Sequence, residues 1–164
     1  MKGAQILELV EIFADLTPGQ LEQIYKICKE ENYHHDEIIF EENSPSTDIY
    51  VIIEGEVEIL VNTSPNQDHF EYNIPQRIAL LEKGQSFGEI ALVDQGLRSA
   101  TARCASEDCR LMLINRKDFM KLLQENHDIG FIVMSNLSAD LCMKIRKTTF
   151  MIRETLMYRS SRSS

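Results

Sequence analysis

The fold class of this 164-residue chain is decided by one stretch, Asp48-Ile49-Tyr50-Val51-Ile52-Ile53-Glu54-Gly55-Glu56-Val57-Glu58-Ile59-Leu60-Val61. Its first half is a run of β-branched and aromatic residues long enough for one strand. Its second half mostly alternates apolar and charged side chains, and Gly55 with Glu56 lies between the two halves. The stretch therefore predicts two consecutive β-strands joined by a tight turn.

Further short apolar runs lie on both sides of this pair, at Ile38–Phe40, Ile78–Leu81, Ala100–Ala102 and Leu111–Ile114. Turn-forming residues separate them, and segment 62–76 is polar with two prolines, which predicts an exposed loop. Many short strands at regular spacing favour a barrel or sandwich over a parallel sheet with crossover helices. We therefore expect a mainly β fold with flanking helices, an eight-stranded jelly-roll β-roll over residues 33–115.

The residues before the predicted roll have helical periodicity. Apolar side chains recur at helical spacing over 4–14, which predicts one short helix there. Thr17 is a predicted N-cap, Pro18 suits the first helical position, and Gln20 completes a capping box, so a second helix is expected over 18–31. Residues 1–32 are thus predicted to be N-terminal helices.

The residues after the roll are helical again. Asn115 is a predicted N-cap, and after a break at 126–128 a long helix is expected to reach about Tyr158. C-terminal helices over 116–158 and a tail over 159–164 complete one domain. A stripe on the long helix is close to a heptad seam, with Thr148 at a polar gap; its apolar members are Leu137, Leu141, Ile145, Ile152 and Leu156. The helix either docks on the roll or, being ~45 Å long, also pairs with a second copy as a homodimer.

Composition limits the function. Hydrophobic residues make up 43% and charged residues 26%, and the net charge is −9, as in an ordinary globular protein. No apolar run approaches the length of a membrane span, and Glu8 and Glu11 do not suit a signal peptide. The four cysteines lack CxxC spacing, which favours reduced thiols in the cytoplasm. Six of the 17 basic residues lie from Lys144 onward, so the acidic body argues against broad DNA binding.

The chemistry is predicted between residues 84 and 101. Gly88 permits close backbone approach by a ligand, and the residues after it begin a short helix, Glu89 to Val93, with free N–H groups. Arg98 could fold back to face those groups with a fixed positive fork. Glu89 would repel an anion, so it suits a hydroxyl pair such as a ribose edge, and without ligand it could pair with Arg98.

One anionic group beside one hydroxyl pair, with no metal ligands close by, indicates a small phosphodiester. Triphosphate sites usually need a glycine loop with lysine, and no GxxxxGK[ST] occurs in the chain. Spacing alone leaves a second interpretation open, because many Gly-Glu pairs with a distant arginine are only surface ion pairs or turns.

Two segments, Phe87–Leu92 and Arg98–Thr101, resemble the phosphate-binding cassette of the cyclic nucleotide-binding domain family. That family includes bacterial catabolite-activator-type regulators, regulatory subunits of cyclic-AMP-dependent protein kinase and cyclic-nucleotide-gated channels. Asp48–Gly55 is similar to its central glycine-ended strand, and Leu111–Leu123 to its last strand and following helix.

The resemblance implies a ligand set for cyclic AMP or cyclic GMP. Glu89 would accept the ribose 2′-hydroxyl beside the Gly88 backbone, and Arg98 would hold the cyclic phosphate. The phosphate would also receive the backbone N–H groups of Ile90 and Ala91 and a hydroxyl from Ser99, which could instead reach the purine edge.

The chain departs from the family pattern at two points. Leu97 stands where a proline often precedes the arginine, so the loop should be less rigidly preset. Glu42-Asn43-Ser44 replaces a common Glu-Gly-Asp, which should reshape a turn and not the pocket.

The contact to the base is left open by the sequence. Thr148 and Thr149 resemble the paired hydroxyl residues of activator-type proteins and are candidate base caps. A gapless alignment instead places Met143-Lys144 there, and the two threonines could equally face solvent or the helical seam.

A metal enzyme is the other candidate class. His34 and His35, with acids at 36, 37 and 41, are possible ligands, and the glycine-ended strand would suit a cupin. Adjacent histidines on a strand point to opposite faces, however, so we expect no metal site. We also expect no catalytic residues, since Cys104 and Cys109 have no neighbouring histidine and suit core or edge thiols.

These observations predict a cytoplasmic regulatory module, not an enzyme, that needs no cofactor. It would bind cyclic AMP or cyclic GMP and pass on its occupancy by repositioning the C-terminal helix. The expected partners are a second copy and a downstream protein. No membrane is expected, since no apolar run is long enough, and no DNA, since the chain ends soon after its last helix. The alternative is a degenerate β-roll that binds no nucleotide and serves as a dimerisation or docking module.

Overall fold

The structure is a computed structural model that describes residues 3–62, 75–94 and 96–162. Short helices come first: η1 (Gly3–Leu9), η2 (Glu11–Phe13) and α1 (Pro18–Tyr25). The strands are β1 (Cys28–His34), β2 (Ile38–Phe40), β3 (Asp48–Glu54), β4 (Val57–Val61), β5 (Gln76–Leu81), β6 (Ser86–Phe87), β7 (Thr101–Cys104) and β8 (Asp108–Asn115). A short helix, η3 (Glu89–Leu92), precedes β7, and α2 (Arg116–Glu125) and α3 (His127–Arg162) end the chain.

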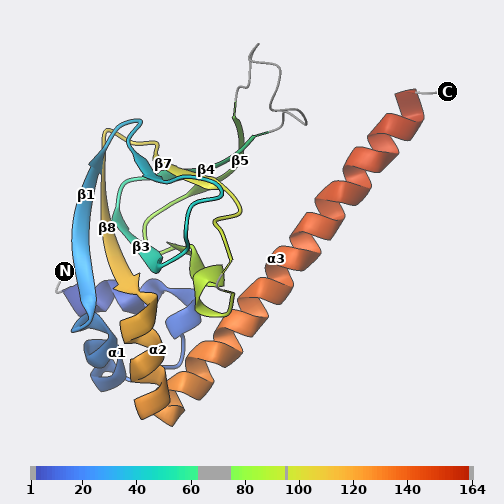
Figure 1. Cartoon of the computed structure of the whole chain (residues 1–164). Coiled ribbons are helices and arrows are strands. Elements are labelled where there is room, and N and C mark those ends of the chain that lie inside the picture. Colours follow the sequence, from blue (N-terminus) through green and yellow to red (C-terminus); the bar gives the residue numbers. More distant parts are fainter. Residues whose placement is uncertain (1–2, 63–74, 95, 163–164) are drawn as a thin grey trace.

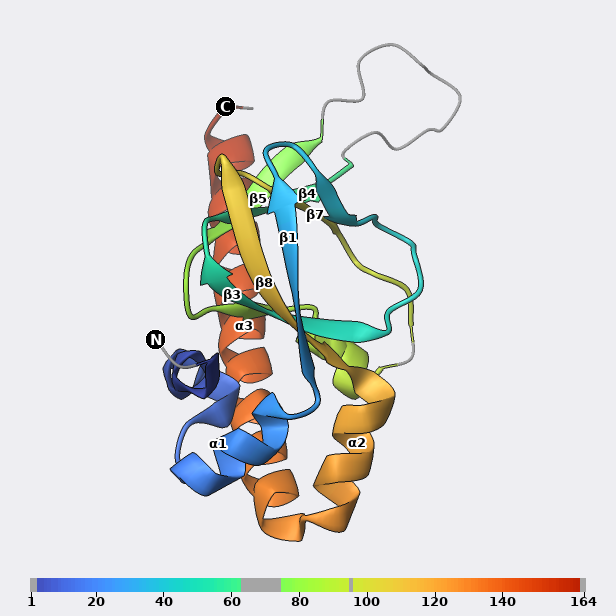
Figure 2. The same cartoon turned by 90° about the vertical axis from the view of Figure 1, so that its left-hand side faces the viewer.

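The eight strands form two four-stranded antiparallel sheets, in the orders β1-β8-β3-β6 and β2-β7-β4-β5. The fold class is confirmed as an eight-stranded β-roll with flanking helices (Figures 1 and 2). The predicted strand pair is present as β3 and β4, and Gly55 makes the turn with a φ of 87°. Most of the predicted loop over 62–76 lies outside the described residues.

Alternation along the strands divides the apolar side chains between two cores. On β3, Ile49 and Val51 pack with the helices, while Tyr50 and Ile52 point into the roll. The helical core also contains Leu92 of η3, which is fully buried. The cassette is therefore anchored in the same core as the N-terminal and C-terminal helices.

The N-terminal helices differ from the prediction. The expected helix over 4–14 is two 3₁₀ helices, separated at Val10, and the second predicted helix ends at Tyr25 rather than 31. The roll starts earlier than residue 33, because Cys28 already pairs with Ile114 of β8. Here tertiary pairing overrides the local helical propensity. The capping box between Thr17 and Gln20 is confirmed.

The C-terminal helices begin as predicted and extend further. Asn115 caps α2 by accepting a hydrogen bond from the Lys117 N–H at 3.1 Å. The helix α3 has 36 residues and continues to Arg162, so residues 159–162 are helical rather than a tail. Its first half is held by three fully buried residues, Ile129, Val133 and Leu137. Figure 1 shows its second half rising clear of the roll.

Candidate functional site

The cassette turns at Gly88, between β6 and η3. Its φ is 73°, which L side chains rarely adopt, and it has a second constraint from packing. A Cβ at this position would lie 2.5 Å from Nη1 of Arg98 and 3.2 Å from the carbonyl oxygen of Asp48. Only glycine lets the guanidinium come this close to the backbone. The short helix that follows was predicted to end at Val93 and ends at Leu92.

Arg98 is buried, with 5% of its surface exposed. Its Nη2 donates to the carbonyl oxygen of Asp48 at 2.8 Å, and its Nη1 donates to that of Gly88 at 3.4 Å. Among the residues that the structure describes, its Nε has no hydrogen-bond partner. Burial lowers the pKa of Arg98, an effect opposed by Tyr50, Asp48 and Glu89. The arginine is thus a buried cation with unused hydrogen-bonding capacity.

Aromatic rings hold the guanidinium in place. The Cζ atom of Arg98 lies 4.1 Å from the ring centroid of Phe40 and 5.5 Å from that of Tyr50. Tyr50 in turn stacks on Phe87, with centroids 5.0 Å apart. Cation–π attraction and packing together restrict the rotamers of a long side chain that would otherwise sample many.

The backbone of Arg98 is held by the turn at residues 42–45, where the departure from the family pattern was expected to reshape the turn and not the pocket. The N–H of Arg98 donates to the Ser44 carbonyl at 2.9 Å, and the N–H of Asn43 donates to the Arg98 carbonyl at 2.8 Å. Pro45 forms a β-bridge with Leu97. The departure at 42–44 thus contacts the cassette directly, and Asn43 keeps a positive φ of 65° that suits its short polar side chain.

Glu89 is as buried as Arg98, at 4% exposure, but it does not pair with it. Its carboxylate instead accepts from Nζ of Lys144 on α3, so the expected Glu89–Arg98 pair is wrong. The reason is that α3 brings a lysine over the carboxylate, while the two terminal nitrogens of Arg98 point to the carbonyl oxygens of Asp48 and Gly88. Nζ of Lys144 also lies 2.9 Å from Oδ2 of Asp140. Burial lowers the pKa of Lys144, but Glu89 and Asp140 outweigh it and the pKa is raised.

The remaining predicted residues have simpler surroundings. Ile90 is half exposed and lies in η3 together with Ala91, while Ser99 is exposed next to Arg98. The hydroxyls of Thr148 and Thr149 each donate to a carbonyl one turn back in α3, those of Lys144 and Ile145, at 2.9 Å. The structure therefore brings Gly88, Glu89 and Arg98 together and leaves both threonines exposed on the helix.

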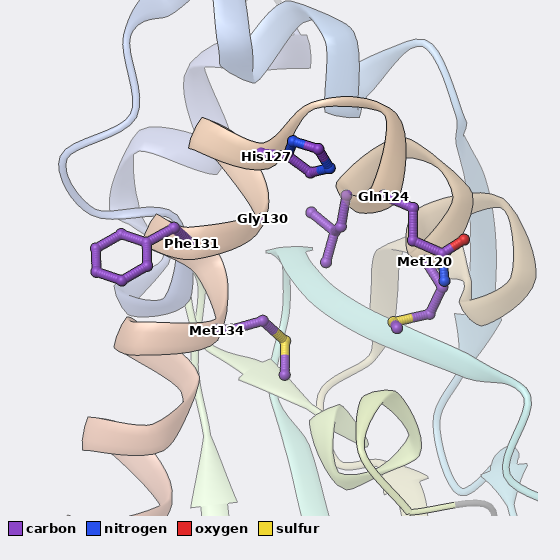
Figure 3. A pocket seen from close by; sticks show the side chains of 7 residues that line it. Met120, Gln124, His127, Gly130, Phe131 and Met134 are labelled. Atoms are coloured by element: carbon purple, nitrogen blue, oxygen red, sulfur yellow. The ribbon is translucent and has the colours of Figure 1, made fainter.

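A separate hollow of about 360 Å³ lies at the corner between α2 and α3 (Figure 3). It contains none of the cassette residues and is mainly apolar; its lining residues are Met120, Leu123, Gln124, His127, Gly130, Phe131 and Met134. Because its lining residues belong to α2, α3 and the corner between them, the hollow is distinct from the candidate site.

The side chains weighed for metal binding have other partners. Nδ1 of His34 lies 2.7 Å from Asp108, and Nδ1 of His35 lies 3.2 Å from the Ser106 carbonyl. Within residues 3–62, 75–94 and 96–162, no group of three or more His, Cys, Asp or Glu side chains is arranged to hold a metal ion. The same ranges contain no helix long and apolar enough to cross a bilayer.

The two central cysteines lie in the interior of the roll. Cys104 and Cys109 are buried free thiols with their sulfur atoms 2.7 Å apart, and burial raises the pKa of Cys104 to about 12. A protonated buried thiol is a poor nucleophile.

Sequence reasoning missed several contributors to the site, among them Phe40, Asp48, Asp140 and, as a partner of Glu89, Lys144. Asp140 and Lys144 carried one available signal, since opposite charges four residues apart on a helix lie on one face. Phe40 and Asp48 carried no such signal, because each contacts Arg98 from 50 or more positions away in the sequence.

Comparison with known proteins identifies the family of the chain. A family model described as the cyclic nucleotide-binding domain matches residues 30–126, more than half of the chain. The Cyclic AMP receptor protein of Thermus thermophilus is 27% identical over 147 residues, 90% of this chain and 60% of that protein. A cGMP-dependent protein kinase of Drosophila melanogaster, isozyme 2 forms cD5/T2, is 28% identical over 127 residues, 77% of this chain and 13% of the kinase. The chain thus spans less than two thirds of either relative.

Solved structures have the same architecture. The catabolite activator protein of Thermus thermophilus superposes with a TM-score of 0.72 at 25% identity, covering 87% of this chain and 61% of that one. The regulatory domain of Toxoplasma gondii PKA, crystallised with cAMP, has a TM-score of 0.63 at 20% identity and shares the fold, covering 73% of this chain and 42% of that one. From its roll, its cassette and the match over residues 30–126, the chain belongs to the cyclic nucleotide-binding domain family.

Proposed function

We propose that the protein binds a cyclic mononucleotide, cyclic AMP or cyclic GMP, at the cassette and acts as a regulatory module rather than as an enzyme. The observation that carries this proposal is the state of Arg98. A guanidinium that is 5% exposed, stacked on Phe40 and left with an unpartnered Nε is costly to bury unless an anion completes its hydrogen bonds.

The roles of the cassette residues follow from the family resemblance and from charge. Arg98 is the cation for the single negative charge of a cyclic phosphate. By the same resemblance, the backbone N–H groups of Ile90 and Ala91 in η3 would donate to this anion. Glu89 is suited to the ribose 2′-hydroxyl, which donates to a carboxylate. Ser99 can turn its hydroxyl to the phosphate or to the purine edge.

The proposed output is a movement of α3. Leu92 lies in one core with Leu137 of α3, so a shift of the cassette changes the surface on which the helix packs. A ligand moves such an equilibrium only by binding one arrangement more tightly than the other. Thr148 lies one turn beyond Lys144, about 6 Å along the helix, and together with Thr149 is the proposed base cap.

The exposed second half of α3 supports a further part of the proposal, a homodimer. Three members of the predicted seam, Ile145, Ile152 and Leu156, are each more than half exposed. Pairing with the same row of a second copy would remove this apolar surface from water. We also propose a cytoplasmic location and a downstream protein partner that responds to the position of α3.

One observation favours the second candidate, a roll that binds no nucleotide and serves as a docking module. The Glu89 carboxylate already has a cationic partner within the chain, Lys144, so the site is internally neutralised on that side. Loss of Arg98 would be the simplest way to abandon an anion, however, and the arginine is retained in a preset geometry.

Isothermal titration with cyclic AMP, cyclic GMP and linear AMP separates the two candidates. A cyclic mononucleotide-binding module should bind at least one cyclic ligand at micromolar concentration and linear AMP, with its extra charge, far more weakly. Absence of binding by all three up to millimolar concentration would favour the docking module.

A further inference from the structure

The contact between Glu89 and Lys144 has a consequence for how a ligand could enter. The Glu89 side chain is 6% exposed, whereas the Lys144 side chain that covers it is 47% exposed. While Lys144 covers this carboxylate, a hydroxyl group from solvent has little access to it. Lys144 belongs to α3, so access to the Glu89 carboxylate depends on the position of this helix.

The lysine is bound by two carboxylates at once. Glu89 comes from the cassette, and Asp140 lies one turn earlier on α3 with a largely buried side chain. Lys144 therefore joins two acids that would repel each other in its absence. Its removal would leave two buried negative charges facing each other, which destabilises the arrangement in which α3 covers the cassette.

We propose that Lys144 is a lock that holds α3 over the cassette and competes with the ligand hydroxyl for Glu89. This inference rests on the proposed function and adds its regulation: the affinity for nucleotide is set by how firmly α3 is held. The apparent dissociation constant equals the intrinsic constant divided by the fraction of molecules in the unlocked form. Releasing the lock must therefore tighten binding, and ligand binding must loosen the helix.

The opposite role, in which Lys144 is a direct ligand contact, predicts the opposite sign. Only Oε1 of Glu89 bonds to Lys144, so a ribose hydroxyl at Oε2 could in principle share the carboxylate with the lysine. In that case removing the lysine would weaken binding. The sign of the change in affinity thus decides between a lock and a ligand contact.

The test compares Lys144→Met with Lys147→Met in the full chain. Lys147 is exposed three residues further along the same helix and takes part in none of the ion pairs of the described residues. We expect Lys144→Met to bind the preferred cyclic nucleotide about tenfold more tightly by titration, and Lys147→Met to match the wild type within about twofold. Lys144→Arg, which keeps the charge, should restore affinity close to that of the wild type.

A second readout does not depend on nucleotide. Hydrogen exchange of the α3 amides around residues 140–150 should be faster in Lys144→Met than in Lys147→Met or the wild type. Weaker nucleotide binding by Lys144→Met, or unchanged exchange, would overturn the lock. If neither the wild type nor Lys144→Met bound any cyclic nucleotide, the proposed function and the competition for Glu89 would both be overturned. Faster exchange would then show only that Lys144 holds the helix.

Discussion

Arg98 and Glu89 are the two buried charges of the cassette, and their surroundings differ in origin. The contacts of Arg98 among the described residues come from the roll or its turns and include the carbonyls of Asp48 and Gly88 and the ring of Phe40. The ionic partner of Glu89 comes from α3, more than 50 residues away in the sequence. The cation is therefore set by the roll itself, while the environment of the carboxylate changes whenever the helix moves.

This difference indicates that the two charges contribute to binding in different ways. A preset guanidinium needs little reorganisation when it meets an anion, so most of the affinity should reside there. The carboxylate contributes a contact whose availability is regulated. Asp48 also links Arg98 to α2. Its carbonyl accepts from Arg98, and its side chain accepts from Nδ2 of Asn115, the residue that caps α2, at 3.0 Å.

The largest expected effect tests the preset guanidinium of Arg98. Arg98→Ala should weaken cyclic nucleotide binding by roughly 4 kcal/mol, a factor of about 1,000, because a buried phosphate would lose its charged partner. Titration calorimetry measures this change. Arg77→Ala is the matched control, since Arg77 is a largely exposed arginine of β5 whose nearest acid, Glu58, is 3.8 Å away. An Arg98→Ala affinity equal to that of Arg77→Ala would refute the role of the arginine.

A smaller effect tests whether the Arg98 guanidinium needs glycine at position 88. Gly88→Ala should destabilise the fold by about 2 kcal/mol, since it combines a positive φ with a Cβ that collides with the guanidinium. Urea unfolding gives this free energy. Gly19→Ala, where a Cβ meets nothing within 4 Å, should cost less than about 0.5 kcal/mol. Equal stabilities of the two variants would mean that the close approach at Gly88 is not required.

The smallest effect concerns the proposed base cap on α3. Thr148→Val should lower the affinity for the preferred nucleotide by about 1 kcal/mol, near fivefold, if its hydroxyl caps the base. Fluorescence competition against a labelled cyclic nucleotide resolves such a change. Thr155→Val, a similar substitution seven residues later, should leave the affinity unchanged. Identical affinities for the two variants would remove Thr148 from the site and leave the base contact to another residue.

Local features were predictable where neighbouring residues decide them. The strand pair around Gly55, the capping box at Thr17–Gln20 and the N-cap at Asn115 all depend on residues within a few positions. The ends of elements set by distant pairing were not predicted. Residues 26–31 suit a helix by themselves, but β1 begins at Cys28 because β8 offers it a hydrogen-bonding edge.

The candidate site divides in the same way. The sequence by itself determined the cassette, its glycine and its two charges, because a turn, a short helix and a strand are encoded within residues 84–101. Tertiary structure alone decided that Arg98 bonds to carbonyls and a ring while Glu89 meets Lys144. Electrostatic partners are selected by distance in space and by burial, and neither quantity is a property of a single segment of the chain.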